Sequence, residues 1–177
     1  MGGQVAIQPV RAGDGPALVA ANLGSIALHE PWVYPCRDQA SFMAYCASCD
    51  GRSKVGFVVR ERPDGPIVGV VNLSEIVRGA LQSAYLGYYG IAGFQGRGFM
   101  SEALSLVVTT AFSEIGLHRL EANIQPANAR SRALARRLGF RQEGFSPRYL
   151  RIGGEWRDHE RWAILAEEWT GAEVSES

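Results

Sequence analysis

The segment of residues 88–104, YYGIAGFQGRGFMSEAL, constrains the fold more than any other part of the chain. Four glycines fall between residues 90 and 98, after an aromatic strand-like stretch and before a helix-forming one. A turn from a strand into a helix presents unpaired backbone N–H groups, and glycine lets a ligand approach the backbone closely. With the helix dipole, this arrangement favours a bound anion such as a diphosphate. A tight turn without a ligand is the alternative interpretation.

Two common phosphate-binding loops do not fit this segment. A P-loop ends in Gly-Lys-Ser/Thr, whereas Gly98 is followed by Phe99 and Met100. A dinucleotide-binding turn needs a third glycine where Ser101 stands, and no strand with a terminal acid follows at the expected distance. The pattern that remains is Gln-x-x-Gly-x-Met over residues 95–100.

The rest of the chain predicts a mixed α/β fold. Alternating apolar residues predict strands over residues 5–10, 55–60, 67–73, 84–91 and 118–124. Capping residues and one-sided apolar faces predict helices over residues 17–23, 38–49, 101–115 and 128–138. Two further strands, 148–152 and 155–165, flank Gly153-Gly154 as a hairpin. We expect one domain over residues 1–170 and a polar tail over 171–177, with no internal repeat.

Composition excludes several classes of protein. The chain has 177 residues, with 18 Lys plus Arg balanced by 18 Asp plus Glu, which gives no support for a nucleic-acid or membrane binder. Long apolar runs and signal-peptide features are missing, so we expect a cytoplasmic location. Cys36, Cys46 and Cys49 are too few for a disulfide framework, and no set of metal ligands is visible.

Several motifs in a fixed order carry a family resemblance. VVNLSEIVRG, YLGY, QGRGFMSEAL, PANARSRALARRLGFRQEG and GGEWRDH follow one another along the chain. Together they resemble the GCN5-related N-acetyltransferase (GNAT) superfamily, and within it the RimJ/RimL branch that acetylates ribosomal-protein alanine. The resemblance runs from about residue 5 to 169. It implies a seven-stranded mixed sheet with helices on both faces, a splayed strand pair and acetyl-CoA as the donor. Met100 departs from the usual Gly or Ala.

The resemblance implies which residues bind the acetyl-CoA donor. Free backbone groups at Tyr89, Gly90 and Ile91 would bind the pantetheine arm and polarise the thioester carbonyl, as donors do in acyl transfer generally. Asn128 would hydrogen-bond a pantetheine amide, in addition to capping a helix. The predicted pyrophosphate loop consists of Gln95, Gly96, Arg97, Gly98, Met100 and Ser101.

Ser131 is the predicted proton donor to the leaving thiolate. A thiol has a reference pKa of about 8.5, so a donor helps it depart. Many superfamily members use a tyrosine at the position where this chain has Ala135, and Ser131 takes the role by elimination. Water or the departing ammonium is the alternative proton source. The arginines on the same segment, Arg130, Arg132, Arg136 and Arg137, form a solvated face or meet the 3′-phosphate.

The acceptor amine must be neutral before it attacks. An α-amino group has a pKa of about 7.7–8.0, so a weak base or an ordered water suffices. Glu75 and Glu121 are the candidates for the base, ahead of Glu102. Trp32 and Tyr34 would line a binding site for the acceptor peptide, or pack onto the core. We expect His118 and His159 to be structural, and the absence of a nucleophile relay predicts direct transfer.

The predicted function is therefore acetyl-CoA-dependent N-acetylation of a primary amine. By resemblance, the acceptor is a protein N-terminal α-amine, with a ribosomal protein as a candidate partner. A small-molecule amine acetyltransferase is the first alternative, and a non-catalytic acyl-CoA sensor is the second. We expect a monomer or homodimer.

Overall fold

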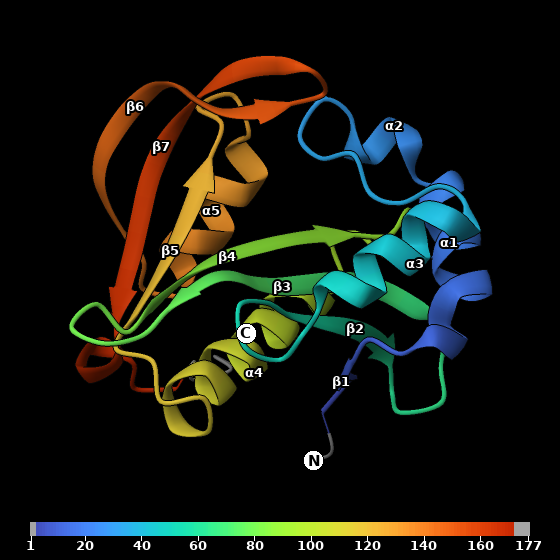
Figure 1. The fold of residues 1–177 in the computed structure, drawn as a ribbon, viewed down its shortest axis with the longest axis horizontal. Helices are drawn as coiled ribbons and strands as arrows, with labels where there is room; N and C mark the ends of the chain where they lie inside the picture. Colours follow the sequence, from blue (N-terminus) through green and yellow to red (C-terminus); the bar gives the residue numbers. More distant parts are fainter. Residues whose placement is uncertain (1–2, 172–177) are drawn as a thin grey trace.

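A computed structural model describes residues 3–171, and the predicted tail beyond residue 171 lies outside them. Seven strands form one sheet in the order β1-β2-β3-β4-β5-β7-β6 (Figure 1). Only β4 and β5 run parallel, and every other neighbouring pair is antiparallel. The expected seven-stranded mixed sheet is confirmed. The strands are β1 (Val5–Pro9), β2 (Val55–Glu61), β3 (Ile67–Val77), β4 (Ser83–Gly90), β5 (Arg119–Ile124), β6 (Arg141–Ile152) and β7 (Glu155–Leu165).

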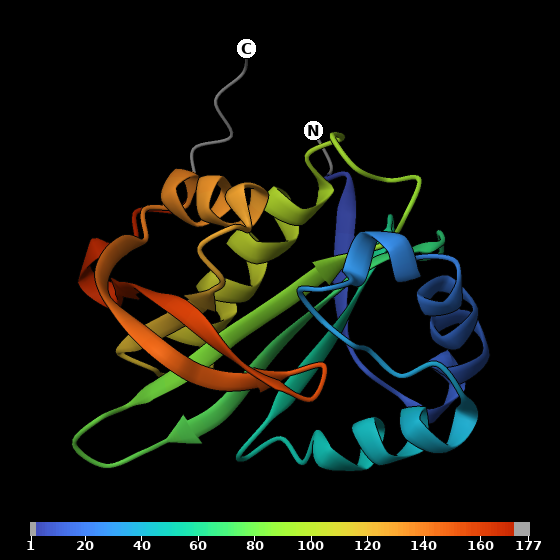
Figure 2. The same ribbon diagram turned by 90° about the horizontal axis from the view of Figure 1, so that it is seen from above.

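Helices cover both faces of this sheet (Figure 2). α4 (Phe99–Ser113) and α5 (Ala129–Arg137) pack on one face, and α1 (Gly15–Leu23), α2 (Ile26–His29) and α3 (Gln39–Ser48) lie on the other. Two short 3-10 helices, η1 (Ala12–Asp14) and η2 (Ala166–Glu168), complete the elements. Among the described residues no helix is long and apolar enough to cross a membrane.

Strand alternation separates two apolar cores. Phe57 and Val59 of β2 join the core under α4, whereas Val58 between them joins the core under α1 and α3. Both cores exclude water, which explains why the central strands read as nearly continuous apolar runs.

β4 and β5 separate along their length. They pair only where Ser83–Tyr85 meets Arg119–Glu121. Beyond that point β4 stays paired with β3 up to Gly90, and β5 stays paired with β7 up to Ile124. The separated ends diverge because each strand follows its own outer neighbour. The splayed pair that the sequence predicts is confirmed.

Several elements differ from the sequence predictions. α4 begins at Phe99, earlier than expected, because Gly98 takes the left-handed conformation (φ 78°) at its N-cap. β6 spans Arg141–Ile152 and not only its last five residues. Its first half shows no clean alternation, because the pairing with β7 shifts register at two places. The short helix α2 was not predicted.

Candidate active site

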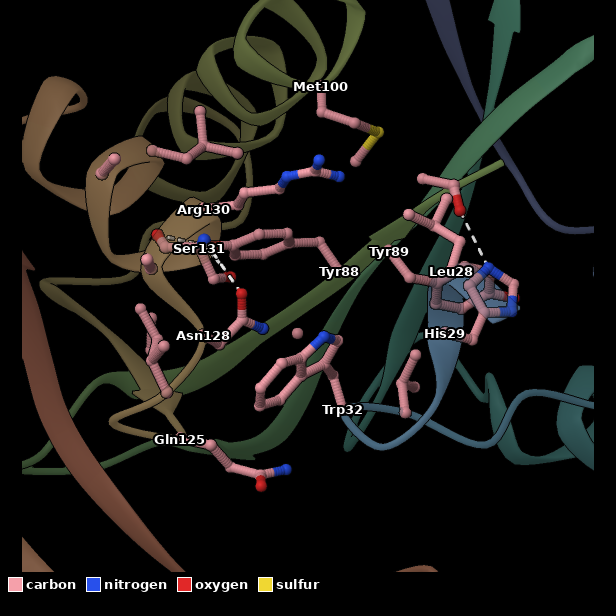
Figure 3. Close-up of a pocket in the computed structure, with 18 of the residues that line it drawn as sticks. Leu28, His29, Trp32, Tyr88, Tyr89, Met100, Gln125, Asn128, Arg130 and Ser131 are labelled. Carbon is pink, nitrogen blue, oxygen red and sulfur yellow. Dashed lines mark hydrogen bonds between the residues drawn. The ribbon is translucent and has the colours of Figure 1, made fainter. Parts of the chain in front are cut away.

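The gap between β4 and β5 opens into a cavity of about 1090 Å³. The cavity runs from the N-terminus of α4, along β4, β5 and α5, to the segment after α2 and the β6–β7 hairpin (Figure 3). None of the described residues that line it is Asp or Glu, whereas Arg130 and Arg137 both line it. The charge of the lining is therefore positive, which suits a ligand with phosphate groups.

The glycine-rich turn is folded so that a helix N-terminus stays open. Gly93, Gly96 and Gly98 have φ values of 90°, 75° and 78°, which glycine adopts without steric cost. The side-chain oxygen of Gln95 accepts the N–H of Gly93 at 2.7 Å and so holds the turn together. No side chain caps α4, so its first N–H groups are left for an anion.

The predicted pyrophosphate-loop residues divide into two groups. Gln95, Gly96 and Met100 line the cavity, whereas Arg97, Gly98 and Ser101 do not. The Arg97 guanidinium pairs with Glu61 at 2.7 Å and lies 4.4 Å from the ring centroid of Phe99. The side chain of Arg97 is therefore engaged by the protein, and only its backbone is available to the turn.

Two glycines explain how the chain accepts Met100, where the sequence resemblance implies Gly or Ala. A Cβ placed on Gly69 would lie 2.3 Å from the Met100 sulfur, and one on Gly90 would lie 3.5 Å from its Cγ. Gly69 and Gly90 are direct partners in the β3–β4 pairing. Their missing side chains leave the space that the thioether fills.

The backbone at the end of β4 presents alternate groups to the gap. The N–H of Ile91 donates to the carbonyl of Val68 at 2.9 Å, so the free N–H expected at Ile91 is not available. Antiparallel pairing alternates, so the backbone of Tyr89 faces β3 and that of Gly90 faces the gap. Gly90 keeps the predicted position for a donor to a thioester carbonyl.

His29 fastens α2 to the end of β4. Its Nε2 lies 2.8 Å from the carbonyl oxygen of Gly90, and its ring packs edge-on against Tyr89. A carbonyl only accepts, so Nε2 carries the hydrogen and Nδ1 holds the lone pair. Nδ1 is buried without a partner among the described residues. Desolvation by burial lowers the pKa of His29, so the imidazole is neutral near pH 7.

Asn128 and Ser131 begin α5 at the edge of the cavity (Figure 3). The side-chain oxygen of Asn128 accepts the N–H of Ser131 at 3.2 Å, which is the predicted helix cap. The amide nitrogen of Asn128 makes no hydrogen bond within residues 3–171. The cap therefore leaves two N–H donors free for a ligand carbonyl.

Tyr88 is a site residue that sequence reasoning missed. The Ser131 hydroxyl donates to the Tyr88 hydroxyl at 2.9 Å, and the Tyr88 hydroxyl lies 3.3 Å from the Ser131 carbonyl oxygen. Burial raises the pKa of Tyr88, so the phenol keeps its proton. Alternation in β4 places Tyr88 on the α5 face with Leu86, and this signal was available in the sequence.

The four arginines of α5 serve two purposes. Arg130 and Arg137 line the cavity. Arg132 pairs with the buried Glu160 of β7 at 2.9 Å, and Arg136 lies over the Trp162 ring at 5.4 Å. Two of the arginines thus line the cavity, and the other two fix α5 to the sheet.

The two aromatics predicted for the acceptor side have different positions. Trp32 lines the cavity, and Tyr34 does not. A Cβ on Gly153 would lie 2.6 Å from the Tyr34 ring, so Tyr34 packs against the β6–β7 turn. Tyr34 joins the segment after α2 to the hairpin and closes that end of the site.

Neither predicted base lies in the cavity. Glu121 pairs with Arg119 at 2.7 Å, and Arg119 also pairs with Glu143. Glu75 is exposed at a positive-φ position where the β3–β4 register shifts. Glu102 accepts the N–H of Val5 at 3.3 Å, which is a structural role. The structure therefore does not bring a carboxylate to the reacting centre.

Among residues 3–171 no group of three or more His, Cys, Asp or Glu is placed to hold a metal ion. A splayed parallel strand pair beside an uncapped helix N-terminus is the arrangement that the sequence resemblance implies for an acyl-CoA-dependent acyltransferase. The family model described as "Acetyltransferase (GNAT) domain" matches residues 4–141. The chain belongs to this family of N-acetyltransferases, and its relatives support the RimJ/RimL-like branch.

Two curated relatives illustrate the similarity. An Escherichia coli (strain K12) protein named [Ribosomal protein uS5]-alanine N-acetyltransferase is 34% identical over 154 residues, which cover 80% of this chain and 77% of the relative. A Bacillus subtilis (strain 168) protein named "Probable N-acetyltransferase YjcK" is 43% identical over 102 residues. That match covers 58% of this chain and only 56% of the relative.

Two solved structures share the fold. Mycobacterium smegmatis RimJ in complex with CoA-disulfide has a TM-score of 0.84 and 32% identity, with coverage of 98% of this chain and 85% of that one. Vibrio cholerae spermidine N-acetyltransferase in complex with CoA and spermine has a TM-score of 0.79, with coverage of 93% and 97%. Its identity is 21%, so it shows the fold alone.

Proposed function

We propose that this enzyme transfers the acetyl group of acetyl-CoA directly to the N-terminal α-amine of a protein. A ribosomal protein is the candidate acceptor, because the E. coli relative is named for that activity. The observation that carries the proposal is the continuous cavity. It joins an uncapped helix N-terminus, the Tyr88–Ser131 hydroxyl pair and an acceptor side without carboxylates.

The donor half of the cavity fits coenzyme A. The open N-terminus of α4 would receive the pyrophosphate, and Arg130 and Arg137 would add positive charge for the phosphates. The free amide donors of Asn128 suit a pantetheine carbonyl. The N–H of Gly90 faces the gap, where it would stabilise negative charge on the thioester oxygen. Acetyl-CoA supplies the acetyl group in activated form.

The hydroxyl pair serves the leaving group. Once the Ser131 hydroxyl turns its hydrogen to the departing thiolate and donates it, the Tyr88 hydroxyl can turn to donate across the same 2.9 Å contact and return a proton to Ser131. Ala135 stands where many superfamily members have a tyrosine, and the Tyr88 phenol is supplied from β4 instead. This arrangement supports a direct transfer without a covalent acyl-enzyme.

The charge of the cavity favours a monocationic acceptor over a polyamine. A polyamine carries several ammonium groups and would need acidic partners, and none of the described lining residues is acidic. An N-terminal amine has a pKa of about 7.7–8.0, against about 10.4 for a lysine-type amine, so more of it is neutral near pH 7 and no carboxylate is needed to deprotonate it. Trp32 and the hairpin strands at the acceptor end would contact the first residues of a peptide.

Thiol release from acetyl-CoA tests the proposal. Peptides with free N-terminal Ala, Ser or Met are compared with the same peptides blocked at the N-terminus and with spermidine and other small amines. We expect turnover with the free peptides alone. Turnover only with small amines would move the function to metabolite acetylation. Silence on all acceptors, with coenzyme A bound, would support the sensor alternative.

A further inference from the structure

His159 lies on the acceptor side of the same cavity. Trp162 and Ile164 of β7 point into the core under α4, so alternation turns His159 to the opposite face of the sheet from Glu160. On that face His159 lines the cavity. Its neighbour Glu160 pairs with Ile124, the last residue of β5, so His159 lies next to the end of β5. Its side chain is 3% exposed. A buried imidazole at the end of the site where the amine must enter requires a chemical explanation.

The tautomer of His159 is fixed by the backbone. Its Nδ1 lies 2.9 Å from the carbonyl oxygen of Arg157, so Nδ1 carries the hydrogen and Nε2 holds the lone pair. Nε2 makes no hydrogen bond to any described residue. The backbone thus holds the ring with an available proton acceptor, in the arrangement that a general base needs.

Elimination points to the same group. The titratable side chains that line the cavity are His29, Tyr88, Tyr89, Arg130, Arg137 and His159. Arginine is always protonated, and burial raises the pKa of both tyrosines, so these four cannot accept a proton near pH 7. The Nδ1 of His29 is enclosed by protein on the far side of its bond to Gly90. His159 is left as the proton acceptor.

We propose that Nε2 of His159 removes the proton from the attacking amine. The inference rests on the function proposed above and adds the missing base. The acceptor ammonium first loses one proton to His159. The neutral nitrogen then bonds to the acetyl carbon, the carbon–sulfur bond breaks, and the nitrogen loses its second proton to solvent. The thiolate takes a proton from the Ser131–Tyr88 pair. The imidazolium then releases its proton to solvent, from which the hydroxyl pair is restored, so protons balance over the cycle.

The surroundings keep His159 neutral but reachable. Desolvation by burial lowers its pKa, and the hydrogen bond to the Arg157 carbonyl and the charge of Asp158 oppose this without reversing it. The Tyr149 ring of β6 lies 6.4 Å from the imidazole, and its hydroxyl is bonded to Tyr85 of β4. Across the cavity α2 presents its last residue, His29, which is neutral near pH 7 because burial lowers its pKa. His159 is therefore unprotonated at pH 7 and becomes protonated only in acid.

Asn123 provides a second contact for the amine on the same face. Its side-chain oxygen is buried without a hydrogen-bond partner among the described residues, and Asn123 lines the cavity. A buried, unpaired acceptor is costly, and a ligand N–H would satisfy it. We infer that Asn123 orients the amine while His159 takes its proton.

The test is the pH dependence of kcat for wild type and His159→Gln, with a free N-terminal Ala peptide at saturation. His118→Gln is the matched control, because His118 is an exposed histidine that pairs with Glu167 away from the cavity. A general base contributes about 10²–10⁴-fold, so we expect His159→Gln to lose about 100-fold at pH 6.5. The loss should shrink to a few-fold at pH 9, where the amine is already neutral. Calorimetry should show unchanged coenzyme A affinity.

The two proposals fail differently. An equal loss at every pH, or wild-type kcat in His159→Gln, would overturn the role of His159 and leave the acetyltransferase proposal standing. Absence of wild-type turnover with every peptide would overturn the proposed acceptor, and the inference with it. Should His159→Gln fail to fold, His159→Asn and the acid limb of the wild-type profile supply the same test. That limb should fall below the ordinary histidine pKa of about 6.5.

Discussion

The hydroxyl pair of Tyr88 and Ser131 makes a quantitative prediction for turnover. Ser131 is placed to reach the sulfur, and Tyr88 acts through Ser131 across 2.9 Å. Removing a positioned proton donor costs about 10²-fold or more, so Ser131→Ala should lower kcat about 100-fold. Tyr88→Phe leaves the Ser131 hydroxyl in place and should cost about 10-fold. The double variant should be no worse than Ser131→Ala, because the two groups act as one unit.

The rate of thiol release at saturating acetyl-CoA and peptide gives kcat for wild type, the two single variants and the double variant. Calorimetry with coenzyme A controls for binding. The lost hydrogen bond of Tyr88→Phe is worth about 1 kcal/mol, so its melting temperature should fall by only about 2–4 °C. A double variant about 1000-fold below wild type would show independent roles and refute the relay. A Tyr88→Phe variant with wild-type kcat would show that the 2.9 Å contact plays no part in turnover.

Three further predictions concern binding and stability. Asn128→Asp keeps the helix cap and removes the amide donors, so calorimetry should show weaker coenzyme A binding with an unchanged melting temperature, whereas Asn128→Ala should lose both. Gly69→Ala should lower the free energy of unfolding in urea by about 1–3 kcal/mol, because the new Cβ would lie 2.3 Å from the Met100 sulfur. In a protein that already carries Met100→Ala, most of that loss should vanish. An equal loss in both backgrounds would place the clash at the Tyr89 carbonyl. Burial lowers the pKa of His29 below its value in the unfolded chain, so the unfolded chain binds more protons in acid. The free energy of unfolding should therefore fall as pH drops through about 6.5 toward the folded pKa. His29→Gln should flatten this pH dependence between pH 7 and 5.

The geometry of the glycine-rich turn could be predicted from the sequence because its constraints are local. Glycines at 93, 96 and 98 require positive φ, and the following apolar face requires a helix, so the open helix N-terminus follows from neighbouring residues. Asn128 and Ser131 lie within one turn, and the cap between them was foreseeable. The Tyr88 contact was not foreseen, since it joins residues 43 positions apart.

The acceptor half could not be read from the chain, because its partners are distant in sequence. Glu121 has the right chemistry for a base, but pairing with Arg119 turns it into a structural ion pair. His159 was expected to be structural, and only the pairing of β5 with β7 shows that it enters the cavity. Tyr34 lies against the hairpin turn because Gly153 has no side chain, a contact across more than a hundred residues.

A crystal structure with a non-hydrolysable acetyl-CoA analogue tests the central claim most directly. We predict that the pyrophosphate lies at the N-terminus of α4 and that the pantetheine arm enters the gap between β4 and β5. The sulfur should lie at hydrogen-bond distance from the Ser131 hydroxyl, with the acetyl oxygen toward the N–H of Gly90. An analogue bound outside the gap, or a sulfur remote from both Ser131 and Tyr88, would contradict the account.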